Sequence, residues 1–125
     1  MRKLNYSRAS YYLAGRFKEI RIEIRNLARH RNFAGVVQAL VNYLKSLHSL
    51  GKLDKVSRYI DYLGKVYNQG NTYVQYIIEN LFVRSLGSFQ RRSDPACWDE
   101  MTRKMPKVFI EIYQRQMNEH LLIKH

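Results

Sequence analysis

The side chains that could do chemistry in this sequence are few, and their spacing builds no catalytic motif. The single cysteine, Cys97, excludes an intramolecular disulfide and a cysteine-based zinc cluster. No HxxxH or similar ligand spacing occurs among the histidines, which are His30, His48, His120 and His125. The sequence also has no glycine-rich phosphate loop and no GxSxG, HExxH or CxxC motif. It nominates no catalytic residue, metal site or cofactor, so we expect a non-enzymatic protein.

Three reactive side chains stand alone in the sequence, and each has a structural interpretation. Cys97 falls in the first turn of an expected helix, where the dipole can lower a thiol pKa, but no histidine is nearby to assist it. His48 borders an apolar stripe and has no ligand partner in sequence, so we expect a structural histidine. Glu79 also borders an apolar stripe. We expect it to reach solvent or pair with an arginine, and a partly buried carboxylate is the alternative.

The charge of the chain is strongly positive and unevenly distributed. It carries 22 Lys and Arg against 10 Asp and Glu, a formal net charge of +12. Residues 1–31 hold nine basic and two acidic residues, so over half of the net charge falls in the first quarter of the sequence. Such a bias favours nucleic acid, an anionic membrane surface or an acidic protein as partner. The acid-free residues 1–18 also have the bias of a mitochondrial presequence, and that alternative stays open.

The first expected helix spans residues 7–31, where apolar residues recur at spacings of three and four. The alternation of Ile20, Ile22 and Ile24 would also suit a strand, but no other segment offers a strand to pair with. One flank carries a basic ladder, which consists of Lys18, Arg21, Arg25 and Arg29. Like charges four residues apart destabilise a helix by roughly 0.2–0.5 kcal/mol. The ladder is therefore a candidate anion-binding face, with a solvated basic face as the alternative.

The central element of the chain is predicted near residues 72–88, with Asn71 or Thr72 as its cap. Its apolar residues cover about half of the helix circumference, so other helices must enclose it. These residues are Val74, Ile77, Ile78, Leu81, Phe82, Leu86 and Phe89. The opposite face carries Tyr73, Tyr76, Asn80, Val83 and Arg84.

The tyrosines of this region form a candidate partner-binding patch. Tyr62 points away from the apolar stripe of its own expected helix, and the central helix follows after a short turn. The patch consists of Tyr62, Tyr73, Tyr76, Asn80 and Arg84. Tyrosine and arginine are enriched at protein interfaces. The alternative is that the C-terminal helix covers the same residues within the monomer.

Capping and turn residues mark the elements before the central helix. The second helix is expected at Phe33–Ser49, with Asn32 as its N-cap and Gly51 in the left-handed position beyond its end. The third is expected at Asp54–Asn68, with Asp54 as its N-cap. The short connection between them predicts an antiparallel hairpin.

The C-terminal third is expected to hold one loop and one interrupted helix. Gln90–Asp94 is polar and basic and is predicted as a loop, and Asp94 with Pro95 is a strong helix start. An apolar stripe continues from Trp98 to Ile112 across Pro106, where a helix must kink or break. Because the stripe keeps its phase, we expect a kinked helix or two nearly collinear ones.

The segment Phe33–Tyr67, with the sequence LGKLD at its turn, resembles a tetratricopeptide-type helix hairpin. It departs from that family where Val56 and Ser57 replace the small residue expected early in the second helix, and no second copy follows. The whole chain resembles small uncharacterised all-helical bacterial proteins with a central segment like Gly70–Phe89. The resemblance implies a helical fold and a non-enzymatic role, and it names no site.

These observations predict one all-α domain over residues 1–125, a compact antiparallel bundle of about five helices. The longest apolar run is far shorter than the roughly 20 residues that span a bilayer, and we expect a cytoplasmic protein. We predict a protein-interaction module that binds an acidic partner or self-associates, for example as a homodimer. The alternative is nucleic-acid binding by the basic ladder with Arg91 and Arg92, and stacking tyrosines. An enzyme is the third class.

Overall fold

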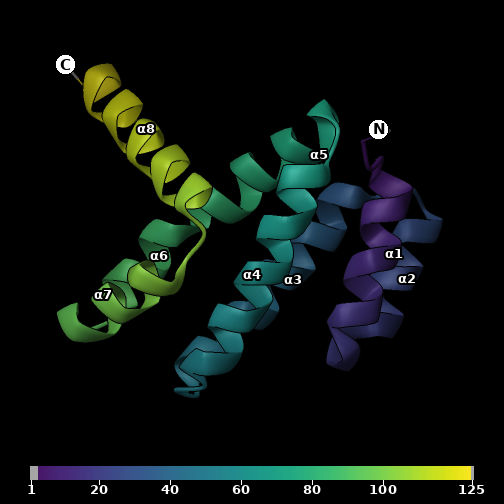
Figure 1. Ribbon diagram of the computed structural model, residues 1–125, viewed down its shortest axis with the longest axis horizontal. Coiled ribbons are helices and arrows are strands. Elements are labelled where there is room, and N and C mark those ends of the chain that lie inside the picture. Colours follow the sequence, from purple (N-terminus) through teal and green to yellow (C-terminus); the bar gives the residue numbers. More distant parts are fainter. Residues whose placement is uncertain (1–2, 125) are drawn as a thin grey trace.

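The residues that the structure describes, 3–124, fold into helices, which confirms the predicted all-α class. The structure is a computed structural model, shown in Figure 1. In chain order the helices are α1 (Tyr6–Arg16), α2 (Arg21–Arg29), α3 (Phe33–Ser49), α4 (Leu53–Gln69), α5 (Thr72–Ile77), α6 (Leu86–Arg92), α7 (Pro95–Lys104) and α8 (Lys107–Lys124). The expected number of about five was too low because the expected first, central and C-terminal helices are each divided into two. His125 lies outside the described residues.

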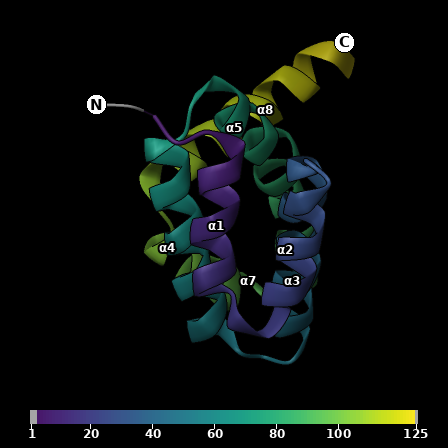
Figure 2. The same ribbon diagram turned by 90° about the vertical axis from the view of Figure 1, so that its right-hand side faces the viewer.

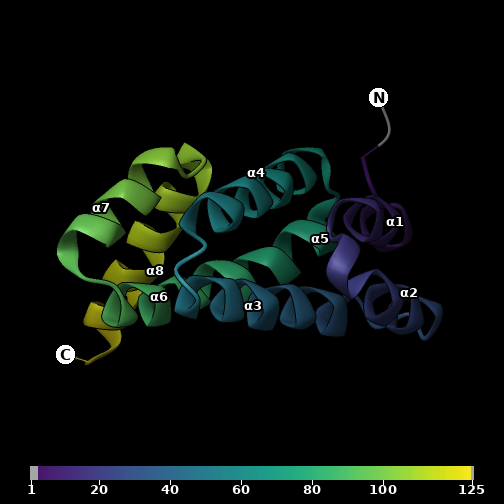
Figure 3. The ribbon, with the colours of Figure 1, turned by 90° about the horizontal axis from the view of Figure 1, so that it is seen from below.

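The predicted central helix runs from α5 to α6 through a π-helical turn (Ile78–Phe82) and a tight turn of 3-10 helix (Val83–Ser85). Figure 3 shows it passing between α3 and α4 from the end of the molecule that holds α1 to the end that holds α7. Its fully buried side chains are Val74, Ile78, Phe82, Val83, Leu86 and Phe89. Val83 was placed on the polar face by its position in a regular helix. The wider π turn shifts the residues that follow it, and α8 packs against the 3-10 turn that contains Val83, so Val83 is buried.

The helix predicted over residues 7–31 is in fact two helices, joined by a short turn at Lys18–Ile20. The break falls at Phe17, whose backbone leaves the helical region with φ −95° and ψ 72°. Phe17 is completely buried, and its ring stacks on that of Tyr59 with centroids 4.4 Å apart. Arg21 caps the end of α1, with its Nε atom 2.9 Å from one of the last carbonyl oxygens. Burial of Phe17 and this cap fold α1 and α2 into a hairpin (Figure 2).

α3 and α4 form the predicted antiparallel hairpin. The Asn32 side chain accepts a backbone N–H of the first turn of α3 at 2.8 Å, and Gly51 has a left-handed φ of 75°. Asp54 was predicted as the cap of α4, but the helix begins at Leu53 and Asp54 lies in its first turn, where it pairs with Lys104 of α7. The two helices diverge from their turn, and this leaves room for the central helix between them (Figure 3).

The start of the chain is attached to the turn between α4 and α5. Leu4 forms an isolated parallel bridge with Gly70, in which the Leu4 N–H donates to the Gln69 carbonyl at 2.7 Å. The Leu4 carbonyl accepts the Asn71 N–H at 2.7 Å. Asn71, one of the two caps predicted for this helix, in turn caps α5 by accepting a backbone N–H at 2.9 Å. These contacts place α1 beside the first residues of the central helix (Figure 2).

The C-terminal third differs most from the expectation. α6 continues to Arg92, so the predicted loop Gln90–Asp94 shrinks to two residues. The helix start at Asp94 is confirmed, because its Oδ1 atom accepts the Cys97 N–H at 2.8 Å.

The apolar stripe that crosses Pro106 is divided between two helices, α7 and α8, which are not collinear as expected. Met105 is extended, with φ −74° and ψ 144°, and α7 and α8 point in different directions (Figure 1). Gly64 of α4 explains the turn, because a Cβ atom on Gly64 would lie 2.8 Å from the Cγ atom of Pro106. The proline ring therefore packs directly on the backbone of α4. Met105 and Phe109, on either side of it, are both buried.

Candidate functional site

The structure divides the tyrosine patch that the sequence predicted. Tyr62 lies on α4, with its ring centroid 5.6 Å from the guanidinium carbon of Arg16. Tyr73 lies on α5 and packs near two other aromatic rings. Its ring centroid is 6.4 Å from that of Tyr6 and 6.3 Å from that of Phe33. Tyr62 therefore belongs to a different surface from the tyrosines of the central helix.

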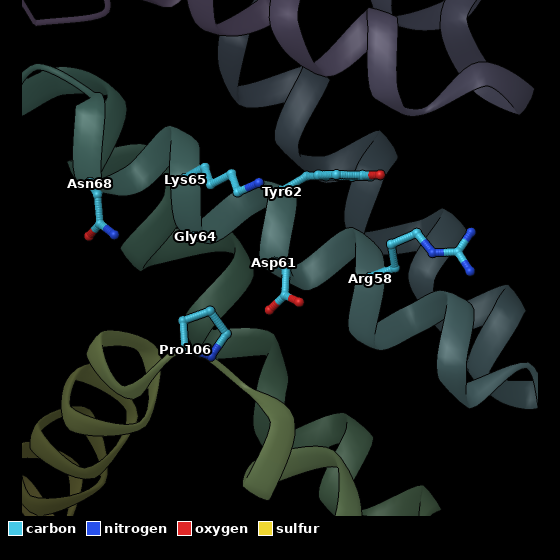
Figure 4. Close-up of a pocket in the computed structure, with 7 residues that line it drawn as sticks. All are labelled: Arg58, Asp61, Tyr62, Gly64, Lys65, Asn68 and Pro106. Carbon is cyan, nitrogen blue, oxygen red and sulfur yellow. The ribbon is translucent and has the colours of Figure 1, made fainter.

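The surface around Tyr62 is a shallow hollow of about 340 Å³ on the outer face of α4 (Figure 4). Arg58 and Lys65 contribute positive charge to its lining, and Asp61 lies between them with a negative charge. The charges are mixed, and Pro106 closes one side. The hollow therefore lacks the single sign of charge that would select an acidic ligand.

The other three patch residues do lie together along the central helix. The Asn80 side chain donates to the Tyr76 carbonyl at 2.8 Å and accepts from the Arg84 Nε atom at 3.2 Å. Tyr76 keeps 61% of its surface exposed. The C-terminal helix packs against the 3-10 turn of the same element and leaves Tyr73, Tyr76 and Arg84 exposed, so it does not cover these three patch residues.

α8 is attached to the central helix by polar contacts at Glu79, which lies in the π turn. As expected, Glu79 pairs with an arginine, since its Oε1 atom lies 2.7 Å from an Nη atom of Arg115. The Tyr67 hydroxyl donates to Oε2 at 2.6 Å, and burial followed by this bond raises the pKa of Tyr67 to about 12. The Gln116 amide donates to the Glu79 carbonyl at 2.9 Å. These bonds join α4, the π turn and α8.

Beside these contacts lies a groove of about 260 Å³, here named the α8 groove. It is lined by Arg84, Gly87 and Arg91 of the central helix and by Tyr113, Gln116, Met117 and His120 of α8. Gln116 is only 7% exposed, and its Oε1 atom is a buried acceptor with no partner among the described residues. An unpaired buried acceptor destabilises a fold by about 1–3 kcal/mol, so a donor for this atom would be favourable.

The basic ladder predicted on the first helix is also divided, because that helix is broken. Lys18 lies in the turn between α1 and α2, and Arg21 is half-buried with its guanidinium on the last carbonyls of α1. Arg25 and Arg29 remain exposed on α2, one turn apart. Within residues 3–124 neither of them forms an ion pair with a carboxylate.

Arg25 and Arg29 belong to both of two adjacent hollows, and together with their surroundings they form what we name the α1–α2 face. The hollows measure about 390 and 310 Å³. The larger one is flanked by Ile22, which is 84% exposed, and the smaller one by Tyr11, which is 81% exposed. Small side chains lie at the smaller hollow, namely Ser7, Ser10, Ala14 and Ala28. Glu23 also lines the larger hollow, whereas the lining residues of the smaller hollow include no acidic one. Positive charge and exposed apolar surface therefore meet most clearly at the smaller hollow.

Sequence reasoning missed several residues of both surfaces. Ile22 was considered only as part of an alternating pattern. It is exposed because α2 begins at Arg21 as a separate helix, so the apolar face of α1 does not continue in register into α2. Arg91 was named only as a candidate phosphate contact in a loop, although helical spacing from Arg84 was a usable signal for its place on this surface. Gln116 and His120 carried no signal in the sequence, because their role depends on where α8 docks.

A further polar cluster, at His48, is explained by the fold. The buried His48 donates through Nε2 to Ser93 Oγ at 2.8 Å, because the Ser93 hydroxyl itself donates to the Phe89 carbonyl. Burial, and then the charge of Arg92, lower the pKa of His48, so the neutral ring is favoured as expected for a structural histidine. Among the described residues no three His, Cys, Asp or Glu side chains gather closely enough to hold a metal ion.

The fold and these surfaces define a small all-α domain with basic hollows on its exterior. The chain belongs to a family described as a domain of unknown function (DUF7674), whose sequence profile matches residues 11–119. No curated protein and no solved structure matches the chain. In the part of the chain that the structure describes, no helix has the length and apolar character needed to cross a bilayer.

Proposed function

We propose that this chain is a non-enzymatic protein-interaction module that binds an acidic protein partner through the α1–α2 face. One observation carries the proposal. Arg25 and Arg29 lie exposed one turn apart, beside Tyr11 and Ile22, which are the two most exposed large hydrophobic residues of the described chain. Paired arginines with adjacent aromatic and aliphatic anchors are typical of protein interfaces.

The chemistry of the face favours an acidic protein over the other two partners considered. A second copy of the chain carries the same charge of +12, so two α1–α2 faces repel each other. A nucleic acid needs a continuous basic track, whereas α2, which carries Arg25, and α6, which carries Arg91, lie toward opposite ends of the molecule (Figure 1). An amphipathic acidic helix supplies carboxylates for the arginines and apolar side chains for Tyr11 and Ile22.

The test is titration calorimetry with a synthetic acidic amphipathic peptide of about 15 residues, long enough for partial helix formation. A single-stranded oligonucleotide of equal charge is titrated in parallel. We expect Arg25→Gln/Arg29→Gln and Tyr11→Ser/Ile22→Ser each to weaken peptide binding by about tenfold or more.

The matched control is Lys52→Gln/Lys107→Gln, which removes two exposed charges away from this face. It should change peptide affinity by less than about twofold. An equal loss in this control would show that net charge alone attracts the peptide, and the proposed face would be wrong. Tighter binding of the oligonucleotide, with a steep salt dependence and no effect of Tyr11→Ser/Ile22→Ser, would replace the proposal by nucleic-acid binding.

A further inference from the structure

The α8 groove holds a basic cluster that the proposed function does not use. Arg84 and Arg91 line it from the central helix, and His120 lines it from α8. In the described part of the chain, neither arginine pairs with a carboxylate. Arg84 uses its Nε atom to donate to Asn80 at 3.2 Å, which leaves its terminal amino groups for another acceptor. The groove is therefore prepared for an anion.

Gly87 keeps the guanidinium of Arg91 close to the helix backbone. A Cβ atom at this position would lie 3.3 Å from an Nη atom of Arg91 and 3.5 Å from the Tyr113 hydroxyl oxygen. The Tyr113 hydroxyl donates to the Gln90 side chain at 2.9 Å, which fixes the ring on this side of the groove. The absence of a side chain at Gly87 thus lets the arginine lie across the helix beside the groove.

Gln116 adds an acceptor to this set of donors. Its amide nitrogen donates to the Glu79 carbonyl, which can only accept, so the orientation of the amide is determined. The Oε1 atom is left buried and without a partner. A site with two arginines and one orphan acceptor matches an anion that itself carries a proton.

We propose that the α8 groove binds phosphate in a protonated form. The charged oxygens accept from Arg84 and Arg91, and the remaining P–OH group donates to Oε1 of Gln116. Because Oε1 is enclosed in the ligand-free chain, this hydrogen bond requires the atoms that cover Oε1 to move aside when the ligand enters. This inference does not rest on the proposed function, because the α1–α2 face lies at the other end of the molecule (Figure 1).

The acceptor gives the site a chemical preference that charge alone does not. Hydrogen phosphate keeps a proton at neutral pH, whereas sulfate has the same shape and charge and none. A phosphate monoester has a second pKa of about 6, so it is largely unprotonated at pH 7.5. The groove should therefore prefer free phosphate to both sulfate and a monoester. A hydrogen bond from the P–OH group to a buried acceptor distinguishes ions that net charge cannot, because phosphate and sulfate carry the same charge.

The experiment is titration of the full chain at pH 7.5 in low-salt chloride buffer with phosphate, sulfate and glycerol 3-phosphate. We expect phosphate to bind about tenfold more tightly than sulfate, and glycerol 3-phosphate to behave like sulfate. Equal affinity for phosphate and sulfate would overturn the proposal. A monoester that binds as tightly as phosphate would overturn it as well, because the site would then not distinguish an anion with a P–OH group from one without it.

Variants locate the site. Arg84→Gln and Arg91→Gln should each weaken phosphate binding by about tenfold, while Arg92→Gln, a neighbouring exposed arginine of α6, should leave it within about twofold. Gln116→Met should lower the phosphate-to-sulfate ratio to about one. Because this change also removes the bond to the Glu79 carbonyl, the ratio in the unaltered chain stays the primary readout. Equal losses in Arg92→Gln and Arg91→Gln would contradict the assignment to this groove.

Discussion

At the scale of single residues, one carboxylate joins the break in the first predicted helix to α4. Glu19 pairs with Lys55, and the Tyr59 hydroxyl donates to the same carboxylate at 3.1 Å. The hydrogen bond from Lys55 is the main cause that lowers the pKa of Glu19 to about 2. Burial, followed by the bond to Glu19, raises the pKa of Tyr59 to about 12. These residues stabilise the turn that creates the α1–α2 face.

Replacement of Glu19 by glutamine should lower the melting temperature at pH 7 by about 2–4 °C, a modest effect because the pair is partly exposed. The pKa of the folded-state carboxyl, about 2, lies below its ordinary value of 4.5. Its stabilising contribution is therefore complete above pH 4.5 and is lost as the pH falls toward 2. Thermal melts between pH 7 and pH 2.5 should show a shallower acid decline for Glu19→Gln than for the unaltered chain.

Glu23→Gln is the matched control for this prediction. Glu23 is exposed on α2 and has no ion pair in residues 3–124. The variant should keep the acid decline of the unaltered chain. Parallel declines in the Glu19 and Glu23 variants would show that Glu19 does not anchor the turn.

At the scale of elements, the sequence predicted what local chemistry determines. The caps Asn32, Asn71 and Asp94 act through a side chain on the following turn, so their positions could be identified without the fold. The break at Phe17 could not, because it depends on a ring from α4 that lies 42 residues further along (59 − 17 = 42). The π turn and the direction of α8 depend in the same way on distant contacts.

Two glycines should respond in opposite ways to alanine. Gly51 has a φ of 75°, which an L side chain adopts only with strain, so Gly51→Ala should destabilise the fold by about 1 kcal/mol. Gly15 lies near the end of α1 with nothing within 4 Å of an added Cβ atom, so Gly15→Ala should stabilise it by about 0.5 kcal/mol. Urea unfolding of both variants measures the difference. Shifts of the same sign would show that backbone conformation does not control these positions.

At the scale of the whole molecule, the candidate surfaces depend on how the two ends attach to the central helix. The α1–α2 face requires the break at Phe17, and the α8 groove requires the docking of α8 at Glu79. Arg25, Arg29 and Arg84 could be nominated from their residue type and spacing. Their companions on other helices could not, because no local pattern reports which helices meet.

The contact between Gly64 and Pro106 should control the attachment of α7 and α8. An added Cβ atom at Gly64 would lie 2.8 Å from Pro106 Cγ, so Gly64→Ala should destabilise the fold by about 1–3 kcal/mol. Hydrogen exchange should increase more in α8 than in α1, because the disturbed contact lies at the start of α8.

Combination with Pro106→Ala tests that assignment. Removal of the ring atoms makes room for the new methyl group, so the double variant should be more stable than the sum of the two single effects predicts. Strict additivity would show that the proline ring is not the group that excludes a side chain at Gly64.

The bridge between Leu4 and Gly70 has a consequence for how the chain is completed during synthesis. The first residues emerge from the ribosome long before the segment that holds them, since positions 4 and 70 are separated by the four helices α1 to α4. Until that segment appears, α1 lacks its tether and Phe17 lacks the ring of Tyr59. The basic N-terminal quarter of the nascent chain therefore lacks these folded-state contacts for much of translation. During that time it is accessible to any factor that recognises positive charge.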